Sequence, residues 1–464
     1  MNPQSERRVN DENDDIWPVT AERGRDGELL IGGVSVNDLA ARFGTPLYVF
    51  DEQTLRERAR LVRDAFTAAY PRSRVVYAAK ALLNLAILRI LHDEGLGLDV
   101  VSGGELYAGL RAGIPAGEIT FHGNNKSEDE LAEAVVVGVG AIVVDNEDEL
   151  ACLGRLSGGS ERPVPIMLRL NPGVDVHTHA KIRTGIADSK FGFPIAHSMA
   201  ERAVAAVREY PSLDLLGYHA HIGSQLFDAT AYLQTIDALL DFAATMRARH
   251  GVTPRVLSPG GGFGIAYLPG ERAVDPRSWA RLAAEAITAA CARYDLPLPE
   301  LVVEPGRSIV GPAGVALYRV GATKRLPGLR TYVAVDGGMA DNIRPALYGA
   351  RYTAVIADRE ASGAEETVTI AGKYCESGDV LIEDISLPPL AAGDLLAIPA
   401  AGAYCLSMAS NYNLATRPAA VLVNDGQARL IRRRERYEDV IRYDAVDGDA
   451  SGDEPWDNPR SNLA

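Results

Sequence analysis

The sequence predicts an α/β plus all-β protein, with a (β/α)8 barrel of the TIM type and a C-terminal antiparallel β-barrel or sandwich domain. From about residue 46 to 310, eight β-rich runs alternate with amphipathic helical stretches, which fits the strand count and length of a (β/α)8 barrel. After residue 311, alternating strand patterns are joined by Gly-, Pro- and Asp-rich turns, which is typical of antiparallel sheet. A doubly wound sheet is the competing architecture, but no GxGxxG motif opens a helix after the first strand.

Eight runs of the first part are predicted as barrel strands. Each is short and followed by a helical stretch, so functional residues are expected where strands end and helices begin. The predicted strands are residues 74–79, 97–101, 118–122, 141–145, 164–170, 214–221, 255–258 and 300–304.

Helices between these strands are predicted from apolar residues at 3.6-residue spacing, over residues 81–94, 128–137 and 229–249. Three helix starts carry the pattern of a capping box, in which a Ser or Asn is followed three residues later by Glu. These pairs are Ser102 with Glu105, Ser127 with Glu130, and Asn146 with Glu149.

The β domain is predicted from seven alternating runs, which are residues 315–321, 331–337, 352–358, 366–372, 394–399, 419–425 and 427–433. We expect residues 46–310 to form the barrel domain, and residues 1–45 to join 311–446 in the β domain. Residues 447–464 lack apolar periodicity and are expected to form a disordered acidic tail.

Composition favours a cytoplasmic enzyme. The chain has 62 Asp and Glu against 47 Lys and Arg, a net charge of −15, which disfavours binding to nucleic acid. The longest strongly apolar run, residues 134–144, is too short to span a membrane, and the polar N-terminus does not resemble a secretory signal. The four cysteines are widely spaced with no CxxC pair, which indicates neither a disulfide framework nor structural zinc.

Lys80 ends the first predicted barrel strand. A lysine at a strand–helix junction is usually solvated and structural. At the mouth of a barrel it can instead serve as a Schiff-base lysine, with its reactivity raised by partial burial.

Two HxH pairs allow a metal-dependent hydrolase as an alternative. His177 with His179, and His219 with His221, are each spaced to face one side of a strand. The first pair lies in a polar loop, however, and a single ring stacked on a flat cofactor explains His221 equally well. We therefore predict no metal site.

Two further strand ends carry candidate cofactor groups. Residues 260–264, Gly-Gly-Gly-Phe-Gly, either form a tight turn or place backbone N–H groups around a phosphate. Glu304 and Arg307 follow the eighth strand and either form a surface pair or point into the site. A carboxylate at that position can hold a heteroaromatic nitrogen in its protonated form, which makes the ring an electron sink.

A polar segment, residues 374–379, interrupts the β domain. Cys375 within it is either a buried structural cysteine or a proton donor beside an acidic group that contacts substrate.

Together and in this order, nine motifs resemble the fold type III, alanine-racemase-like pyridoxal-phosphate decarboxylases. The resemblance extends from about Ile16 to Asp444 and is closest to the branch that acts on diaminopimelate. The motifs are YAAK, DVVSGGEL, HGNNKS, HIGSQ, GGGFGI, EPGR, DGGMADNIRPALYGA, CESGD and MASNYN.

The resemblance implies pyridoxal 5'-phosphate as the cofactor. Lys80 would bind it covalently, His221 would stack on its ring, and Glu304 would pair with the pyridine nitrogen. Asp99 would lie near the lysine. The phosphate would be held by Gly261, Gly262, Gly306 and Arg307, helped by Ser224 and Tyr404.

The resemblance also implies a homodimer with shared active sites. Cys375 and Glu376 would reach the partner's site, as proton donor and as reader of the distal ammonium of the substrate. The substrate's second carboxylate would be bound by Arg307, Arg344 and Tyr348, with Tyr404 alongside and Ile182 on a closing loop over residues 177–190.

The expected function is decarboxylation of meso-2,6-diaminopimelate to L-lysine and CO2, the last step of lysine biosynthesis. Two arginines suit a substrate with a second carboxylate that must be bound and not lost. Tyr374, where many relatives have His, leaves room for a related decarboxylase acting on another, even carrier-bound, amino acid. A racemase would need a second base facing Lys80. An inactive regulatory homologue would be expected to lack Lys80, Glu304 or Cys375, and all three are present.

Overall fold

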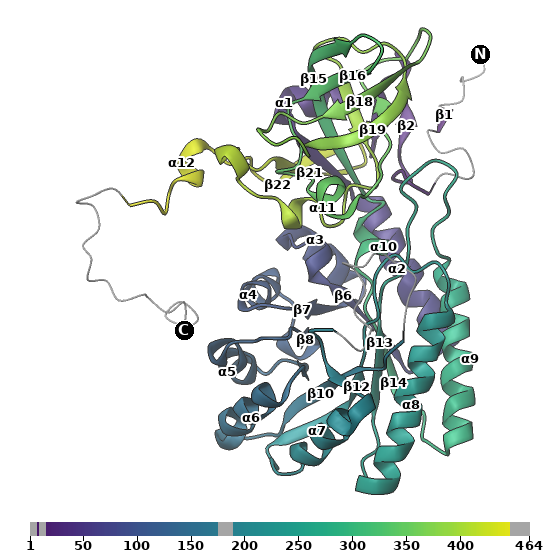
Figure 1. Ribbon diagram of the computed structural model, residues 1–464, viewed down its shortest axis with the longest axis vertical. Helices are drawn as coiled ribbons and strands as arrows, with labels where there is room; N and C mark the ends of the chain where they lie inside the picture. Colours follow the sequence, from purple (N-terminus) through teal and green to yellow (C-terminus); the bar gives the residue numbers. More distant parts are fainter. Residues whose placement is uncertain (1–6, 9–14, 175–188, 446–464) are drawn as a thin grey trace.

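The computed structural model describes residues 7–8, 15–174 and 189–445, and it contains a closed parallel barrel beneath a separate β-rich unit (Figure 1). Neighbouring barrel strands are parallel, and pairing of β10 with β9 closes the ring. All eight predicted strands are confirmed, with ends that differ by at most two residues. They are β6 (Ser73–Ala78), β7 (Gly97–Val100), β8 (Ile119–Phe121), β9 (Ala141–Val144), β10 (Val164–Asn171), β12 (Leu213–His219), β13 (Val256–Gly260) and β14 (Glu300–Val303). A short strand, β11 (Phe193–Pro194), pairs with the end of β10.

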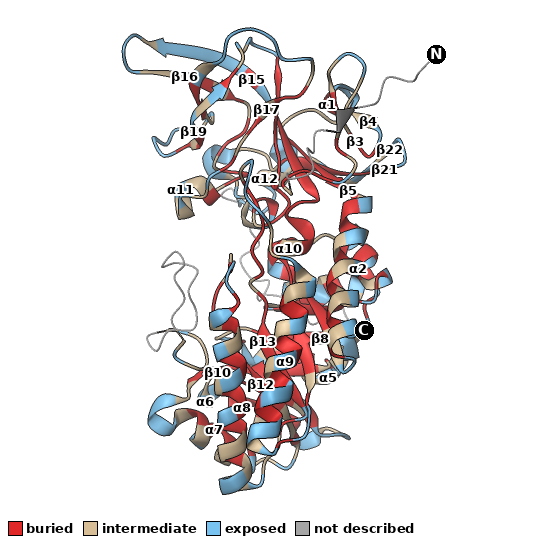
Figure 2. Cartoon of the chain, turned by 90° about the vertical axis from the view of Figure 1, so that its right-hand side faces the viewer, coloured by how far each residue is buried: buried red, intermediate tan, exposed pale blue. Residues whose placement is uncertain are grey.

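Helices surround the barrel and turn their buried faces toward it (Figure 2). The helix predicted over 81–94 begins only at Leu85, because the Asn84 side chain accepts the N–H of Ala86 and caps it there. Helices α5 and α8 match their predictions within one residue. The outer helices are α2 (Glu52–Ala69), α3 (Leu85–Asp93), α4 (Gly103–Ala112), α5 (Glu128–Val137), α6 (Glu147–Leu156), α7 (Met199–Val207), α8 (Thr230–His250) and α9 (Pro276–Tyr294).

Only one of the three predicted capping boxes is complete, the pair Ser127 and Glu130. Ser102 and Asn146 do accept the expected backbone N–H groups. The glutamates of those two pairs are used elsewhere, since Glu105 accepts the N–H of Val101 and Glu149 forms a buried ion pair.

The second sheet is mixed and contains more strands than predicted. Its order is β19-β18-β16-β15-β5-β21-β22, with β20 beside β15 and β17 beside β20. Most pairings are antiparallel, but β16–β18 and β5–β21 are parallel. Two of its strands were not predicted. One is β5 (Leu47–Asp51), and the other is β19, whose central Glu383 and Asp384 weaken its β pattern. The strands are β15 (Gly314–Leu326), β16 (Arg330–Val335), β17 (Val355–Ile356), β18 (Glu366–Ala371), β19 (Val380–Leu387), β20 (Leu395–Ile398), β21 (Ala419–Asn424) and β22 (Gln427–Arg432).

Strand β5 (Leu47–Asp51) lies within the range predicted for the barrel, yet it is a central strand of the second sheet. It pairs antiparallel with β15 and parallel with β21, and all five of its residues are buried. Such continuous burial suits a strand covered on both faces. We therefore place the start of the barrel domain at Glu52.

Smaller elements complete the β-rich unit and its junction with the barrel. At the N-terminal side these are β1 (Arg7–Arg8), β2 (Glu22–Arg23), β3 (Leu29–Ile31), β4 (Val34–Ser35) and α1 (Val36–Phe43), and further along the chain are α10 (Arg307–Val310), α11 (Arg344–Tyr348) and α12 (Tyr437–Val440). No helix in the described ranges is long and apolar enough to cross a membrane. The predicted tail, residues 447–464, and the HxH pair at His177 and His179 lie outside the described residues.

Candidate active site

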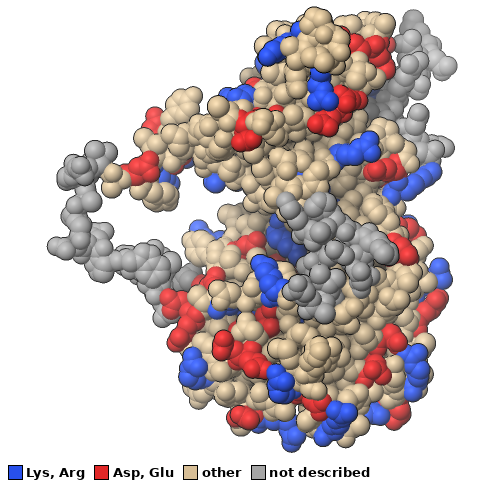
Figure 3. All heavy atoms as spheres, in the orientation of Figure 1, with Lys and Arg blue, Asp and Glu red and all other residues tan. Residues whose placement is uncertain are grey.

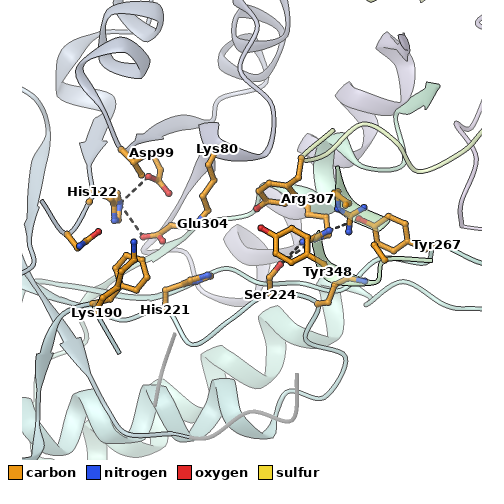
Figure 4. A pocket seen from close by; sticks show the side chains of 18 of the residues that line it. Lys80, Asp99, His122, Lys190, His221, Ser224, Tyr267, Glu304, Arg307 and Tyr348 are labelled. Atoms are coloured by element: carbon orange, nitrogen blue, oxygen red, sulfur yellow. Dashed lines mark hydrogen bonds and ion pairs between the residues drawn. The ribbon is translucent and has the colours of Figure 1, made fainter. Parts of the chain in front are cut away.

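A cavity of about 870 Å³ opens where the barrel strands end, beneath the β-rich unit. Lys80, at the end of β6, extends into it toward the carboxylates of Asp99 and Glu304 (Figure 4). On the face of the molecule shown in Figure 3, acidic and basic side chains are interspersed. The position of the cavity, at the carboxyl ends of the strands, is the one expected from the barrel topology. The predicted residues that line this cavity are Lys80, Asp99, His221, Ser224, Glu304, Arg307, Arg344, Tyr348 and Tyr404.

One end of the cavity holds Glu304 in a dense hydrogen-bonded cluster. The Ser258 hydroxyl donates to one carboxylate oxygen at 2.7 Å, and His219 Nε2 lies 3.1 Å from the other. Although burial opposes ionisation, the neighbouring His219 and His122 and these hydrogen bonds hold the pKa of Glu304 well below its ordinary value. The group is therefore a carboxylate at neutral pH.

Asp99 lies at the same end and behaves in the opposite way. Burial and the negative charge of Glu304 raise the pKa of Asp99 well above its ordinary value, while the charge of Lys80 counteracts them. Its Oδ1 atom is 3.6 Å from His122 Nε2 and has no hydrogen-bond partner among the residues that the structure describes. Two buried carboxyl groups thus share one site, and only one of them is readily ionised.

The two histidines of the predicted HxH pair, His219 and His221, lie in different surroundings. His219 belongs to the Glu304 cluster, in which His122, His219 and Glu304 offer atoms within 4.8 Å of one another, a spacing that would also suit a metal. Both Glu304 oxygens already have hydrogen-bonding neighbours in the protein. His221 lies beyond the strand end, and burial with the charges of Lys80 and Arg169 lowers its pKa well below the ordinary value. Its ring is neutral.

A small hollow adjoins the cavity and shares Lys80, Asp99, His221 and Glu304 with its lining. Gly262 has φ +98°, and a Cβ there would lie 2.4 Å from the carbonyl oxygen of Gly223, so only glycine fits. Gly261 is buried beside it and donates its N–H to His221 Nδ1 at 3.4 Å. The Ser308 hydroxyl, which also lines the hollow, is buried without a partner. The other polar or glycine residues of the lining include Ser224, Gly306, Arg307 and Tyr404.

The opposite end of the cavity holds two buried arginines. Arg307 and Arg344 are 8% and 5% exposed, and within the described part of the chain neither forms an ion pair with a carboxylate. Arg307 donates to the hydroxyl of Tyr267 at 2.5 Å and to that of Ser224 at 3.1 Å. Arg344 donates to the hydroxyl of Tyr352. Buried cations held only by neutral groups attract an anionic ligand.

The structure does not bring every predicted residue to this cavity. Cys375 and Glu376 are exposed and do not line it. The segment that carries them is fixed by Asp379, which accepts the N–H groups of Met339 and Tyr374, and by Asn413, which accepts the N–H of Cys375. The alternative of a buried structural Cys375 is wrong. Ile182 lies outside the described residues.

Several residues of the site had no predicted role. His122 and Ser258 complete the Glu304 cluster, and Arg169, between Asp145 and the ring of Phe191, lines the cavity. These residues lie at or near strand ends of the barrel, so their position was a usable signal. Tyr267 and Tyr352 lie in loops, and nothing in their sequence patterns indicates that they hold arginines.

Comparison with known proteins agrees with this site. The family described as "Pyridoxal-dependent decarboxylase, pyridoxal binding domain" matches residues 52–311. The chain is 47% identical to a diaminopimelate decarboxylase of Bacillus subtilis, over 92% of this chain and 97% of that relative. It is also 47% identical to one from Synechocystis, over 94% of each chain. A crystal structure of the M. jannaschii enzyme of the same name, in complex with L-lysine, aligns with a TM-score of 0.84 at 35% identity and covers 92% of this chain and 98% of that one.

Proposed function

The chain belongs to the pyridoxal-dependent decarboxylases, and from this premise we propose that it converts meso-2,6-diaminopimelate to L-lysine and CO2. It is a lyase that uses pyridoxal 5'-phosphate. The observation that carries the choice of substrate is the pair of buried cavity arginines, Arg307 and Arg344, which form no ion pair with a carboxylate in the described part of the chain.

The residues present fit the cofactor. Lys80 is the amine that would bind it, the neutral ring of His221 can lie against a flat heterocycle, and the carboxylate of Glu304 can pair with a protonated ring nitrogen. The hollow beside Gly262 offers backbone groups and the unpartnered Ser308 hydroxyl to a phosphate. An orphaned buried hydroxyl is costly unless a ligand or water satisfies it.

When bound, pyridoxal phosphate supplies an electron sink for the bonding pair that CO2 leaves behind. Glu304 stays ionised at neutral pH and so keeps a positive charge favourable beside it. Lys80, just beyond strand β6, would hold the cofactor through its amine, and Asp99, which lines the cavity with it, would hold or release a proton. Residues of the β-rich unit, among them Arg344, Tyr348 and Tyr404, cover part of the cavity and would limit the contact of bound substrate with water.

Recognition of the substrate falls to the arginine end. Arg307 and Arg344, with Tyr348 nearby, would bind the carboxylate that is retained in the product. A decarboxylase for lysine or ornithine has no second carboxylate to bind, so its site would favour an acidic group there. A carrier-bound acidic amino acid is a weaker candidate as substrate. The relative from Bacillus subtilis is named for diaminopimelate itself, and the chain matches it over 97% of its length.

We further propose that the protein is a homodimer in which each chain completes its partner's site. Cys375 and Glu376 are exposed and do not line the cavity of their own chain, yet backbone hydrogen bonds to Asp379 and Asn413 anchor the turn that holds them. Exposed apolar side chains suit burial at a subunit interface, including Leu414, Tyr437, Ile441 and Tyr443 at 62%, 78%, 50% and 88% exposure. In the dimer Cys375 would donate the proton to the substrate carbon, and Glu376 would bind the distal ammonium. The free state of all four cysteines is in keeping with a cytoplasmic setting.

The proposal is tested by product analysis of the purified holoenzyme. We expect lysine and CO2 from meso-diaminopimelate, and no product from L-lysine, L-ornithine, L-arginine or L-glutamate. Lys80→Ala is the blank, because removal of the amine that binds the cofactor lowers turnover by more than about 10³-fold. Product from ornithine instead would transfer the chain to a related decarboxylase. Cofactor-loaded protein without any product would favour an inactive regulatory homologue.

A further inference from the structure

We propose that Tyr267 is a positioning residue that sets the distance and orientation of the Arg307 and Arg344 guanidinium groups. The inference rests on the proposed function, since it concerns how the receptor for the retained carboxylate is built. Tyr267 is 7% exposed, lines the cavity and lies beside Arg307 (Figure 4).

Tyr267 contacts the two arginines with different parts of its side chain. Its hydroxyl accepts a hydrogen bond from Arg307 Nη1 at 2.5 Å. Its ring face lies under Arg344, whose Cζ atom is 4.7 Å from the ring centroid. One rigid ring with two rotatable bonds therefore fixes the relative position of both cations.

Tyr352 supports the same arrangement from behind. Its ring meets that of Tyr267 edge to face, with centroids 5.4 Å apart and planes at 86°. The Tyr352 hydroxyl accepts from Arg344 and lies 3.6 Å from Cys405 Sγ in a buried position. The two tyrosines thus form a packed pair, with one hydroxyl on each arginine.

The backbone that carries Tyr267 is held on both sides. Gln225 bonds to both the N–H and the carbonyl of Ile265, at 3.0 and 3.1 Å. The Glu271 carboxylate accepts the N–H groups of Tyr267 and Leu268, at 2.9 and 3.1 Å. These bonds close a tight loop directly after the glycine turn at Gly262, so the ring has little freedom to move.

Tyrosine can hold each arginine without weakening the affinity of the two arginines for the carboxylate of the substrate. A carboxylate behind each arginine would hold it equally well, but it would neutralise the charge that the substrate must meet. A phenol accepts the hydrogen bond and, as a ring, stabilises a cation while remaining neutral. The site thus stays positive until an anion arrives.

The test uses the product and its decarboxylated analogue as inhibitors of the holoenzyme. L-lysine keeps the carboxylate that the arginines bind, whereas 1,5-diaminopentane lacks it. For Tyr267→Phe, which keeps the ring and loses the hydroxyl, we expect KM for diaminopimelate and Ki for lysine to rise about tenfold. The Ki for diaminopentane and kcat should stay within about twofold. Tyr267→Leu, which loses the ring as well, should raise the first two constants further, to about 100-fold.

Tyr232→Phe is the matched control, because Tyr232 is fully buried, its hydroxyl has no partner, and it does not line the cavity. Tyr352→Phe provides a second variant should Tyr267 variants fold poorly, and the same selective loss is expected. Equal weakening of lysine and diaminopentane, or constants like those of Tyr232→Phe, would overturn the inference. Absence of turnover in the unmodified enzyme would instead reject the proposed function, so the two failures are distinguishable.

Discussion

The two ends of the cavity hold their charges in opposite ways. At the Lys80 end, the ionised Glu304 carboxylate accepts a hydrogen bond from Ser258 and lies 3.1 Å from His219 Nε2, while the pKa of its neighbour Asp99 is raised. At the other end Arg307 and Arg344 are equally buried, but among the described residues their guanidinium groups bond to hydroxyls and lie against rings, without an ion pair.

This difference indicates that the Lys80 end serves the reaction and the arginine end serves recognition of the substrate. A compensated cluster keeps its protonation states fixed, which suits a site that must hold a cofactor ring in one charge state. An uncompensated pair of cations is costly until a ligand neutralises it, so its binding energy is available to the substrate. The first end is built from the ends of parallel strands. At the second end Arg307 also follows a barrel strand, β14, whereas Arg344 begins α11 in the β-rich unit and Tyr267 and Tyr352 lie in loops (Figure 4).

Cys375 lines neither end of the cavity, and we propose that it acts in the partner's site. A complementation experiment tests this with the largest expected effect. Co-expression of Lys80→Ala and Cys375→Ala chains, each strongly impaired alone, should yield hybrid dimers with one intact site of two. For random pairing we expect about a quarter of the unmodified activity to return. If the mixture stays as inactive as its parents, each site is built within one chain.

The buried ion pair behind the Lys80 end tests whether compensation there contributes to stability. Lys126 Nζ lies 2.8 Å from Glu149 Oε1 and also donates to the carbonyls of Gly123 and Val143. Lys126→Met leaves Glu149 buried without a cation, and we expect the free energy of unfolding to fall by about 3 kcal/mol.

The double variant Lys126→Met with Glu149→Leu should recover most of that loss, because both charges are then absent. Denaturant unfolding of the two variants and the unmodified protein measures the difference. A single variant as stable as the double one would show that Glu149 does not need its partner. Burial already raises the pKa of Glu149 to about 7, although Lys126 counteracts that rise.

The sequence was informative about the barrel and much less so about the second domain. The eight barrel strands follow from short apolar runs between amphipathic helices, a pattern that local residues determine. Strand β19 was not predicted because Glu383 and Asp384 interrupt its apolar pattern. Strand β5 was not predicted either, and its residues fell within the range given to the barrel domain because its pairing partners are distant in the chain. Pairing between distant segments is decided by tertiary packing, which periodicity does not report.

The site shows the same division. Lys80 and Glu304 were predicted because they follow strands, and Cys375 was one of two alternatives for its polar segment. The role of Arg344, and the placement of Cys375 in a partner's site, came from resemblance to a family. Tyr267 and Tyr352, which hold the arginines, could not be predicted from the sequence. No local pattern indicates which side chain a tyrosine in a loop contacts.

The central claim is that the two ends do different work, and a kinetic comparison of Glu304→Gln and Arg344→Gln tests it most directly. With diaminopimelate as substrate, Glu304→Gln should lower kcat by about 100-fold or more and leave KM within about threefold. Arg344→Gln should raise KM by about 10- to 100-fold with a smaller change in kcat, while the exposed Arg319→Gln serves as control. If Arg344→Gln lowers kcat at unchanged KM, or Glu304→Gln only raises KM, the division between the two ends is contradicted.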